Sequence, residues 1–199
     1  YDQLEAIHRN GKRAADYAKR LLFMVRPTDN KSPVAVNVLE SLQEVIGMVS
    51  SPRARRGIQL VRKLPQDNAS YPAVMAVQGQ LDDVWVNLLN NAYEALEDKQ
   101  GATITVETRY DADARQIIVR ISDNGPGMPQ EVYERIFQPF FTTKDYGTGL
   151  GLHICRQIVE QVNGKIEVQS FIGQGTRFTV SLPVVSEKSQ TLMHEDAAL

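Results

Sequence analysis

Residues 84–96, VWVNLLNNAYEAL, predict the helix around which the rest of the chain is organised. Apolar side chains fall on almost every side of this segment, a pattern typical of a helix buried in a core. Asn87 and Asn91 interrupt it four residues apart, so the two amides share one helix face. A buried amide without a partner costs on the order of 1–3 kcal/mol. The pair therefore either caps neighbouring backbone groups or binds a ligand, because amide oxygens can hold Mg²⁺ together with phosphates and water.

Segments with strand and helix patterns flank this helix on both sides. Alternating apolar and polar residues at 102–108 and 115–122 predict a β-hairpin. Several predicted strands are adjacent in the chain, which favours a sheet with its helices on one face over a doubly wound parallel sheet. The other predicted strands are 34–38, 57–64, 73–77, 165–170 and 176–182, and the other predicted helices are 1–25, 39–49, 130–136 and 149–162.

A polar connector with two prolines, residues 27–33, predicts a boundary between an N-terminal helix and the main domain. The helix, within residues 1–26, carries apolar or small residues at alternating spacings of three and four. This spacing predicts pairing with another helix; an amphipathic helix packed on its own domain is the alternative. The main domain covers 34–184, and residues 185–199 form a polar tail. Because the chain starts inside a helical pattern without Met, we expect it to be a fragment of a longer protein.

The composition, 42% hydrophobic and 23% charged, is that of an ordinary soluble globular protein. A net charge of −2 gives no general attraction to nucleic acid, and no aromatic residue lies within the basic stretch 53–63, so we expect no nucleic-acid partner. The single cysteine, Cys155, excludes an internal disulfide. No apolar run approaches the ~20 residues that span a bilayer. We expect a cytoplasmic domain, and membrane anchoring of the intact protein stays open.

A second motif, ISDNGPGM at 121–128, follows directly after a predicted strand. Asp123 lies on its tight turn, where a carboxylate can accept a hydrogen bond from an exocyclic amine such as that of adenine. Gly125 and Gly127 let the backbone approach a flat ligand closely. An ordinary Asp-Asn-Gly turn is the alternative interpretation.

A glycine-rich loop, GTGLG at 147–151, leads into a predicted helix. Free backbone N–H groups at the start of a helix bind phosphate, and here Thr148 can add a hydroxyl and Lys144 a positive charge. A plain glycine-rich connector is the alternative. A fourth motif, GQGTRF at 173–178, has the composition of a hairpin turn and leads into the last strand.

Three phenylalanines precede the glycine-rich loop: Phe137, Phe140 and Phe141. They predict that residues 138–147 form a mobile lid anchored by aromatic contacts. We expect this lid to close on a terminal phosphate, so that Lys144 contributes its charge only after closure.

In this order, the four motifs resemble the N, G1, F–G2 and G3 boxes of the GHKL ATPase superfamily, and specifically those of bacterial two-component sensor histidine kinases. The resemblance covers about residues 34–183. It implies the ATP-binding domain of such a kinase, with ATP and Mg²⁺ as ligands. The implied fold is an α/β (α+β) two-layer sandwich, the Bergerat fold, in which a mixed sheet packs under about three helices after one N-terminal helix.

The resemblance also implies a role for each motif residue. Asn91 is similar to the asparagine that binds Mg²⁺, and Asn87 is similar to a second asparagine on the phosphate side of that ion. The resemblance thus implies three catalytic residues: Asn87, Asn91 and Lys144. Asp123 resembles the carboxylate that accepts a hydrogen bond from the adenine amine. The other residues expected to bind the nucleotide are Gly125, Gly127, Phe140, Gly147, Thr148, Gly149, Leu150, Gly151 and Thr176.

The function implied is that of a histidine protein kinase, which transfers the γ-phosphoryl group of ATP to a histidine for relay to a response regulator. The N-terminal helix resembles the second helix of the dimerisation and phosphotransfer hairpin, which implies a homodimer in the intact protein. The phosphoacceptor motif is missing, and His8 has no proline near it, so we expect His8 to be a surface residue. This fragment is therefore not expected to autophosphorylate.

Two other functions stay open at this point: a GHKL ATPase that hydrolyses ATP, and a degenerate, non-catalytic nucleotide-binding module. Hydrolysing members of the superfamily typically carry a glutamate where Asn87 stands. A carboxylate can take a proton from water, whereas an amide cannot. Glu94 is an alternative base, but three residues past Asn91 we expect it on the wrong side for water.

Overall fold

The computed structural model describes residues 11, 32–50, 57–67, 71–144 and 147–185. The predictions for the N-terminal helix, including His8, and for the tail beyond residue 185 concern residues outside these ranges. Within the described ranges, no helix has the length and apolar character needed to cross a membrane.

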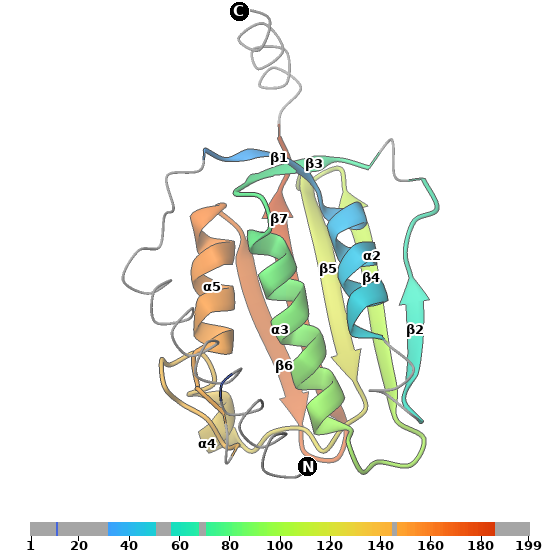
Figure 1. Ribbon diagram of the computed structural model, residues 1–199, viewed down its shortest axis with the longest axis vertical. Helices are drawn as coiled ribbons and strands as arrows, with labels where there is room; N and C mark the ends of the chain where they lie inside the picture. Colours follow the sequence, from blue (N-terminus) through green and yellow to red (C-terminus); the bar gives the residue numbers. More distant parts are fainter. Residues whose placement is uncertain (1–10, 12–31, 51–56, 68–70, 145–146, 186–199) are drawn as a thin grey trace, which may run out of the picture.

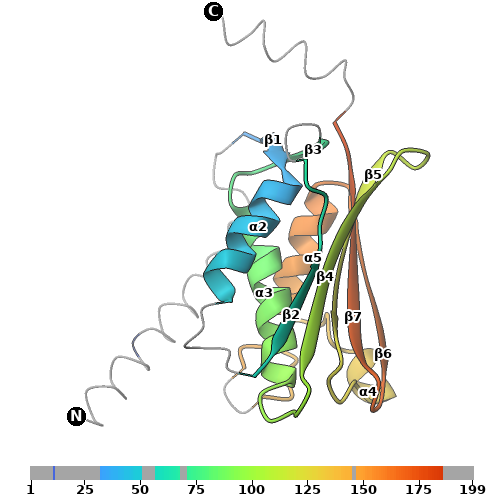
Figure 2. The ribbon, with the colours of Figure 1, turned by 90° about the vertical axis from the view of Figure 1, so that its right-hand side faces the viewer.

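The described helices are α2 (Val38–Val49), α3 (Gln80–Ala95), α4 (Gln130–Tyr133) and α5 (Gly151–Gln161). The described strands are β1 (Val34–Asn37), β2 (Gln59–Lys63), β3 (Ala73–Ala76), β4 (Thr103–Asp111), β5 (Gln116–Asp123), β6 (Lys165–Phe171) and β7 (Gly175–Pro183). Figures 1 and 2 show α2, α3 and α5 side by side on one face of the large sheet. This arrangement confirms the predicted two-layer sandwich with about three helices over a sheet.

The large sheet has the strand order β2-β4-β5-β7-β6. It is mixed, as predicted, because β2 runs parallel to β4 while the other neighbours are antiparallel. The predicted hairpin is β4–β5, closed by the pair Asp111 and Gln116. β1 and β3 form a separate antiparallel pair, which Figure 1 shows crossing one end of the molecule. The chain therefore contributes only five of its seven described strands to the surface under the helices.

The core lies between the helices and the sheet face that they cover. Strand register aligns inward side chains in rows across the sheet, such as Val106, Ile121 and Phe178. All three are buried, as the alternation of apolar residues predicts. On the opposite face, charged residues pair across strands, for example Arg120 with Glu107 at 3.0 Å. One sheet face is therefore packed and the other is polar, which is typical of largely antiparallel sheets.

α3 differs from its prediction, because it is not buried on almost every side. Its buried residues form one stripe at helical spacing: Leu81, Val84, Trp85, Leu88, Leu89, Ala92 and Tyr93. The opposite side carries Asp83 and Glu94, which are exposed, and Asn87 and Asn91, which are partly exposed. The apolar stripe is wide enough to give the segment its apolar composition, but one polar face stays open.

Asn163 and Gly164 follow the end of α5 and differ in their roles. Asn163, not Gly164, has the left-handed backbone, with φ of +56°. Asparagine tolerates this conformation better than most residues do. Gly164 is needed for close packing instead, since a Cβ there would lie 2.7 Å from the Ser181 carbonyl oxygen.

Two glycine-to-alanine substitutions should therefore have opposite effects on stability. Gly47 lies within α2, and a Cβ there meets nothing within 4 Å, so Gly47→Ala should raise the free energy of unfolding by about 0.5–1 kcal/mol. Gly164→Ala forces strand β7 and the end of α5 apart and should lower it by about 1–3 kcal/mol. Denaturant unfolding measures both, and a stabilising Gly164→Ala would contradict this account of the close packing.

Candidate functional site

The four motifs meet at one end of the molecule, where α3 and β5 end and α5 begins (Figure 1). The DNGPG turn contacts the end of α3, since a Cβ at Gly125 would lie 3.3 Å from the Ala95 carbonyl oxygen. It also contacts the start of β7, where the Thr176 N–H donates to Asp123 Oδ1 at 3.2 Å. The fold thus joins three segments that are far apart in the sequence around Asp123.

Asp123 is both a turn residue and a partly buried carboxylate. Its Oδ1 accepts the N–H of Gly125 at 2.8 Å, two residues on, which is the geometry of the ordinary Asp-Asn-Gly turn. Burial raises the pKa of Asp123, and the hydrogen bonds from Gly125 and Thr176 oppose that rise. Because both of these bonds go to Oδ1, we expect Oδ2 to serve as an acceptor for a ligand amine. The two interpretations of the motif are therefore compatible.

Glycines allow the backbones around Asp123 to touch. A Cβ at Gly127, where φ is +71°, would lie 2.0 Å from the Phe171 carbonyl oxygen. A Cβ at Gly175 would lie 2.0 Å from the carbonyl oxygen of Asp123. Neither approach is possible for another residue. The DNGPG turn and the GQGT turn are therefore packed backbone to backbone.

Two residues that the sequence did not single out hold this junction. Ser170 accepts the Met128 N–H at 2.9 Å, and its hydroxyl lies 3.0 Å from that of Thr176. Asn124 accepts the Thr103 N–H and donates to the Gly101 carbonyl, both at 2.9 Å, and so ties the turn to the start of β4. Ser170 could have been found from hairpin register, since it pairs with Thr176 across the turn.

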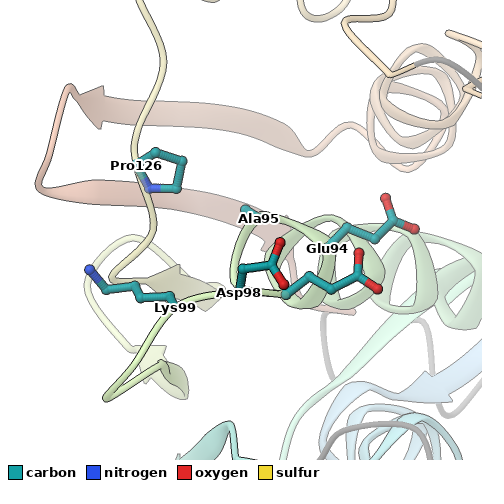
Figure 3. A pocket seen from close by; sticks show the side chains of 6 residues that line it. Glu94, Ala95, Asp98, Lys99 and Pro126 are labelled. Carbon is teal, nitrogen blue, oxygen red and sulfur yellow. The ribbon is translucent and has the colours of Figure 1, made fainter.

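An opening of about 380 Å³ lies beside the DNGPG turn. Figure 3 shows Pro126 on one side of it, and Ala95 and Asp98 at the end of α3 on the other. Its lining residues are Glu94, Ala95, Glu97, Asp98, Lys99 and Pro126. One wall is therefore strongly acidic, which favours an amine or a cation over a bare phosphate.

The predicted aromatic anchor of the lid consists of two phenylalanines rather than three. Phe137 packs edge-on against Phe178, with ring centroids 6.4 Å apart. The guanidinium of Arg135 lies over the Phe141 ring, 4.3 Å from its centroid. Phe140, by contrast, is 62% exposed and has a φ of +65°, so it is not part of the anchor. A bulky residue with a positive φ is strained, which is a frequent property of functional loops.

The glycine-rich loop packs against residues 140–142. A Cβ at Gly149 would lie 2.3 Å from the carbonyl carbon of Phe140, and one at Gly147 would lie 2.2 Å from Thr142 Oγ1. The Thr148 hydroxyl accepts the Leu150 N–H at 3.2 Å.

Leu150, at the start of α5, is buried in the core, so only its backbone could take part in binding. Among the described residues, no side chain caps α5, so the N–H groups of its first turn are oriented for an anion.

The two asparagines of α3 have different surroundings. Asn87 Nδ2 donates to the Asp83 carbonyl at 2.7 Å, so its amide does cap a backbone group. Asn91 Oδ1 instead accepts from Lys144 Nζ at 2.7 Å. The same ammonium contacts a carboxylate oxygen of Glu94. Glu94 therefore lies on the same face of α3 as Asn91, the face that Lys144 contacts.

These donors fit a magnesium ion that arrives with a nucleotide. Among the described residues there is no group of three or more His, Cys, Asp or Glu side chains that could hold a metal by itself. Asn91 and Glu94 nevertheless present two oxygen atoms to one cation, at present the Lys144 ammonium. Mg²⁺ is usually bound in this way, by one or two side-chain oxygens together with substrate phosphates and water.

Comparison with known proteins identifies the family of this domain. Residues 76–186 match the family of histidine kinase-, DNA gyrase B- and HSP90-like ATPases. The sensor histidine kinase ZraS of Salmonella typhi is 37% identical over 168 residues, which cover 84% of this chain and 35% of that protein. The chain spans less than half the length of the curated relatives it matches.

Solved structures give the same result. The catalytic domain of the histidine kinase ThkA is similar with a TM-score of 0.65 and 30% identity, covering 76% of this chain and 95% of that domain. A crystal structure of ThkA in complex with the response regulator protein TrrA is similar with a TM-score of 0.72 and 26% identity, covering 94% of this chain and 52% of that one.

Asp123→Asn should weaken binding of ADP by about tenfold or more, because an ionic hydrogen bond contributes ~1.5–3 kcal/mol. Asparagine keeps the Oδ1 acceptor for Gly125 and Thr176, so the turn should persist. Titration calorimetry measures the affinity, and unchanged affinity would contradict the assignment of Asp123 to the adenine amine.

The same variant has a stability signature with a defined sign. Because burial raises the pKa of Asp123 in the folded state, its carboxyl group opposes folding once pH rises through that pKa. Asp123→Asn removes this penalty, so the nucleotide-free domain should melt at a slightly higher temperature at neutral pH. The difference should vanish in acid, where both side chains are neutral.

Proposed function

Because the chain belongs to the family of histidine kinase-, DNA gyrase B- and HSP90-like ATPases and carries the ATP-binding catalytic domain of a sensor histidine kinase, we propose that it transfers the γ-phosphoryl group of ATP to a histidine for relay to a response regulator. One observation carries this proposal. The four motifs form an unbroken set of contacts: Gly125 with Ala95, Asp123 with Thr176, Lys144 with Asn91, and Phe140 with Gly149.

Each part of ATP finds a matching group in this arrangement. The adenine amine donates to Asp123, while Gly125 and Gly127 allow the backbone close to the ring, and the Thr176 hydroxyl completes the adenine side. The phosphates lie at the start of α5 and along the loop of Gly147, Thr148, Gly149, Leu150 and Gly151.

Asn91 would hold the Mg²⁺, with Asn87 on the phosphate side. When bound, the ion would neutralise charge on the phosphates during transfer. Lys144 adds a further positive charge at the terminal phosphate, and Phe140 lies exposed in the lid above the glycine loop. The chain's own contribution to the rate is thus positioning and charge neutralisation.

Transfer to an imidazole needs no general base from the protein. A neutral imidazole nitrogen already carries a lone pair, which attacks the γ-phosphorus while the bond to the bridging oxygen breaks and ADP leaves with that electron pair. Asn87 cannot take a proton from water, and its amide is held by the Asp83 carbonyl. These surroundings favour phosphoryl transfer over hydrolysis.

The partners follow from this activity. We propose that the acceptor histidine lies on the protein's own phosphoacceptor helix and that the intact kinase acts as a homodimer. A cognate response regulator is the second partner. ThkA has been crystallised with the response regulator protein TrrA, which supports a partner of this class. Residues 1–26 are proposed to be the second helix of the dimerisation hairpin.

Asn91→Ala should reduce phosphorylation of a supplied phosphoacceptor hairpin by about tenfold to a hundredfold, the range typical of impaired metal binding. Alanine is the best helix former, so the melting temperature should change little. Asn90→Ala is the matched control, since Asn90 lies ~100° around the helix. If Asn91→Ala unfolds the domain while its folded fraction transfers normally, Asn91 has only a structural role.

We propose further that the lid, residues 138–147, closes over the terminal phosphate. In amide hydrogen exchange, the described flanks 141–144 and 147–149 should gain more protection with an unhydrolysable ATP analogue than with ADP. The reason is that only the triphosphate carries the γ-phosphate that Lys144 would contact. Equal protection with and without nucleotide would show a loop that is already rigid.

A further inference from the structure

The Lys144 ammonium lies between an amide oxygen and a carboxylate oxygen of α3. It is 2.7 Å from Asn91 Oδ1 and it also contacts Glu94 Oε2. The two oxygens come from residues three apart on α3, so they share the open face of that helix. The lysine comes from a loop 50 residues further along the chain. An ammonium from the segment before the glycine-rich loop is therefore bound by an amide–carboxylate pair on α3.

This contact can be exchanged. The side chains of Lys144 and Glu94 are 46% and 49% exposed, so water screens their attraction. Half-exposed ion pairs hold weakly. Amide and carboxylate oxygens are also the ligands that Mg²⁺ prefers. A divalent ion that arrives with a nucleotide can therefore displace the ammonium from both oxygens.

The charge of the neighbouring wall makes such a cation necessary. Glu94, Glu97 and Asp98 line the opening beside the DNGPG turn, and Lys99 is the only basic residue in that lining. A triphosphate close to these carboxylates is repelled unless a cation lies between them. Glu94 is the carboxylate nearest to Asn91 by chain position, and among the described residues of this lining it is the one that contacts the Lys144 ammonium.

We propose that Glu94 is a second protein ligand of the nucleotide's Mg²⁺, beside Asn91, and that the Lys144 ammonium holds this place until the metal arrives. The inference rests on the proposed nucleotide site. Displacement of Lys144 by the metal frees its charge for the terminal phosphate. Exchange of the Lys144 ammonium for Mg²⁺ thus fills the metal site and releases Lys144. The metal therefore binds before Lys144 contacts the terminal phosphate.

The test measures how much Mg²⁺ strengthens ADP binding, as the ratio of the dissociation constants in chelator and in saturating Mg²⁺. ADP is used because it lacks the phosphate that Lys144 would contact. Glu94→Gln removes the charged ligand and should lower this ratio by about tenfold, as loss of a metal-supporting group does. Lys144→Met removes the competing cation and should raise the ratio. Both are read by titration calorimetry, without any turnover.

Glu97→Gln is the matched control. It makes the same chemical change on the same acidic wall, but beyond the end of α3, so it reports the effect of charge alone. The ratio should change by less than about twofold, as expected for a screened charge. Equal losses in Glu94→Gln and Glu97→Gln would overturn the proposal, and so would an unchanged ratio in Lys144→Met.

Two controls separate this proposal from the proposed function. Thermal melting without nucleotide checks that each variant is folded. If the unaltered chain binds no adenine nucleotide, the proposed function fails. If the unaltered chain binds ADP more tightly with Mg²⁺ and Glu94→Gln does so to the same extent, only the role of Glu94 fails. Paramagnetic Mn²⁺ gives an independent readout, because water-proton relaxation should weaken in Glu94→Gln.

Discussion

The burial of one stripe of α3 is the constraint on which the rest of the structure depends. Trp85, Leu88 and Leu89 are fully buried, and they fix the rotation of the helix over the sheet. Because rotation is fixed, the opposite face carries Asn91 and Glu94, the residues that we propose to bind Mg²⁺. A helix buried on every side would leave no face for these two polar side chains. One helix, α3, therefore contributes one face to the core and the other face to the proposed Mg²⁺ site.

A second set of contacts brings the other motifs to the end of α3. The turn after β5 touches the end of α3, and the start of β7 donates a backbone N–H to Asp123. The contact of β7 needs glycine at Gly175, since a side chain there would collide with the Asp123 backbone, and a Cβ at Gly125 would lie 2.8 Å from Asp123 Oδ1. Burial raises the pKa of Asp123, so its ionised carboxylate costs free energy that the hydrogen bonds from Gly125 and Thr176 offset in part.

Periodicity and turn chemistry were sufficient to predict the layers, the β4–β5 hairpin and the inward rows of the sheet, because these depend on local pattern. Periodicity and turn chemistry could not predict contacts between residues that are far apart in the chain. The sequence did not reveal that Lys144 meets Glu94, which lies 50 residues earlier, nor that Phe140 has a positive φ outside the aromatic anchor. Asn124 was missed for a similar reason, since its partner is set by how turns pack together. Ser170 was missed although the register of the β6–β7 hairpin pairs it with Thr176.

The position of β7 has a consequence for biosynthesis. It is the last described strand in the chain, yet it lies between β5 and β6 in the sheet. Its Thr176 N–H also completes the bonds of Asp123. A ribosome must therefore release nearly the whole domain before the nucleotide pocket can exist. Bound ATP therefore cannot stabilise an incomplete chain. Until β7 is added, the edge of β5 is unpaired, and this edge is the part that chaperones would have to cover.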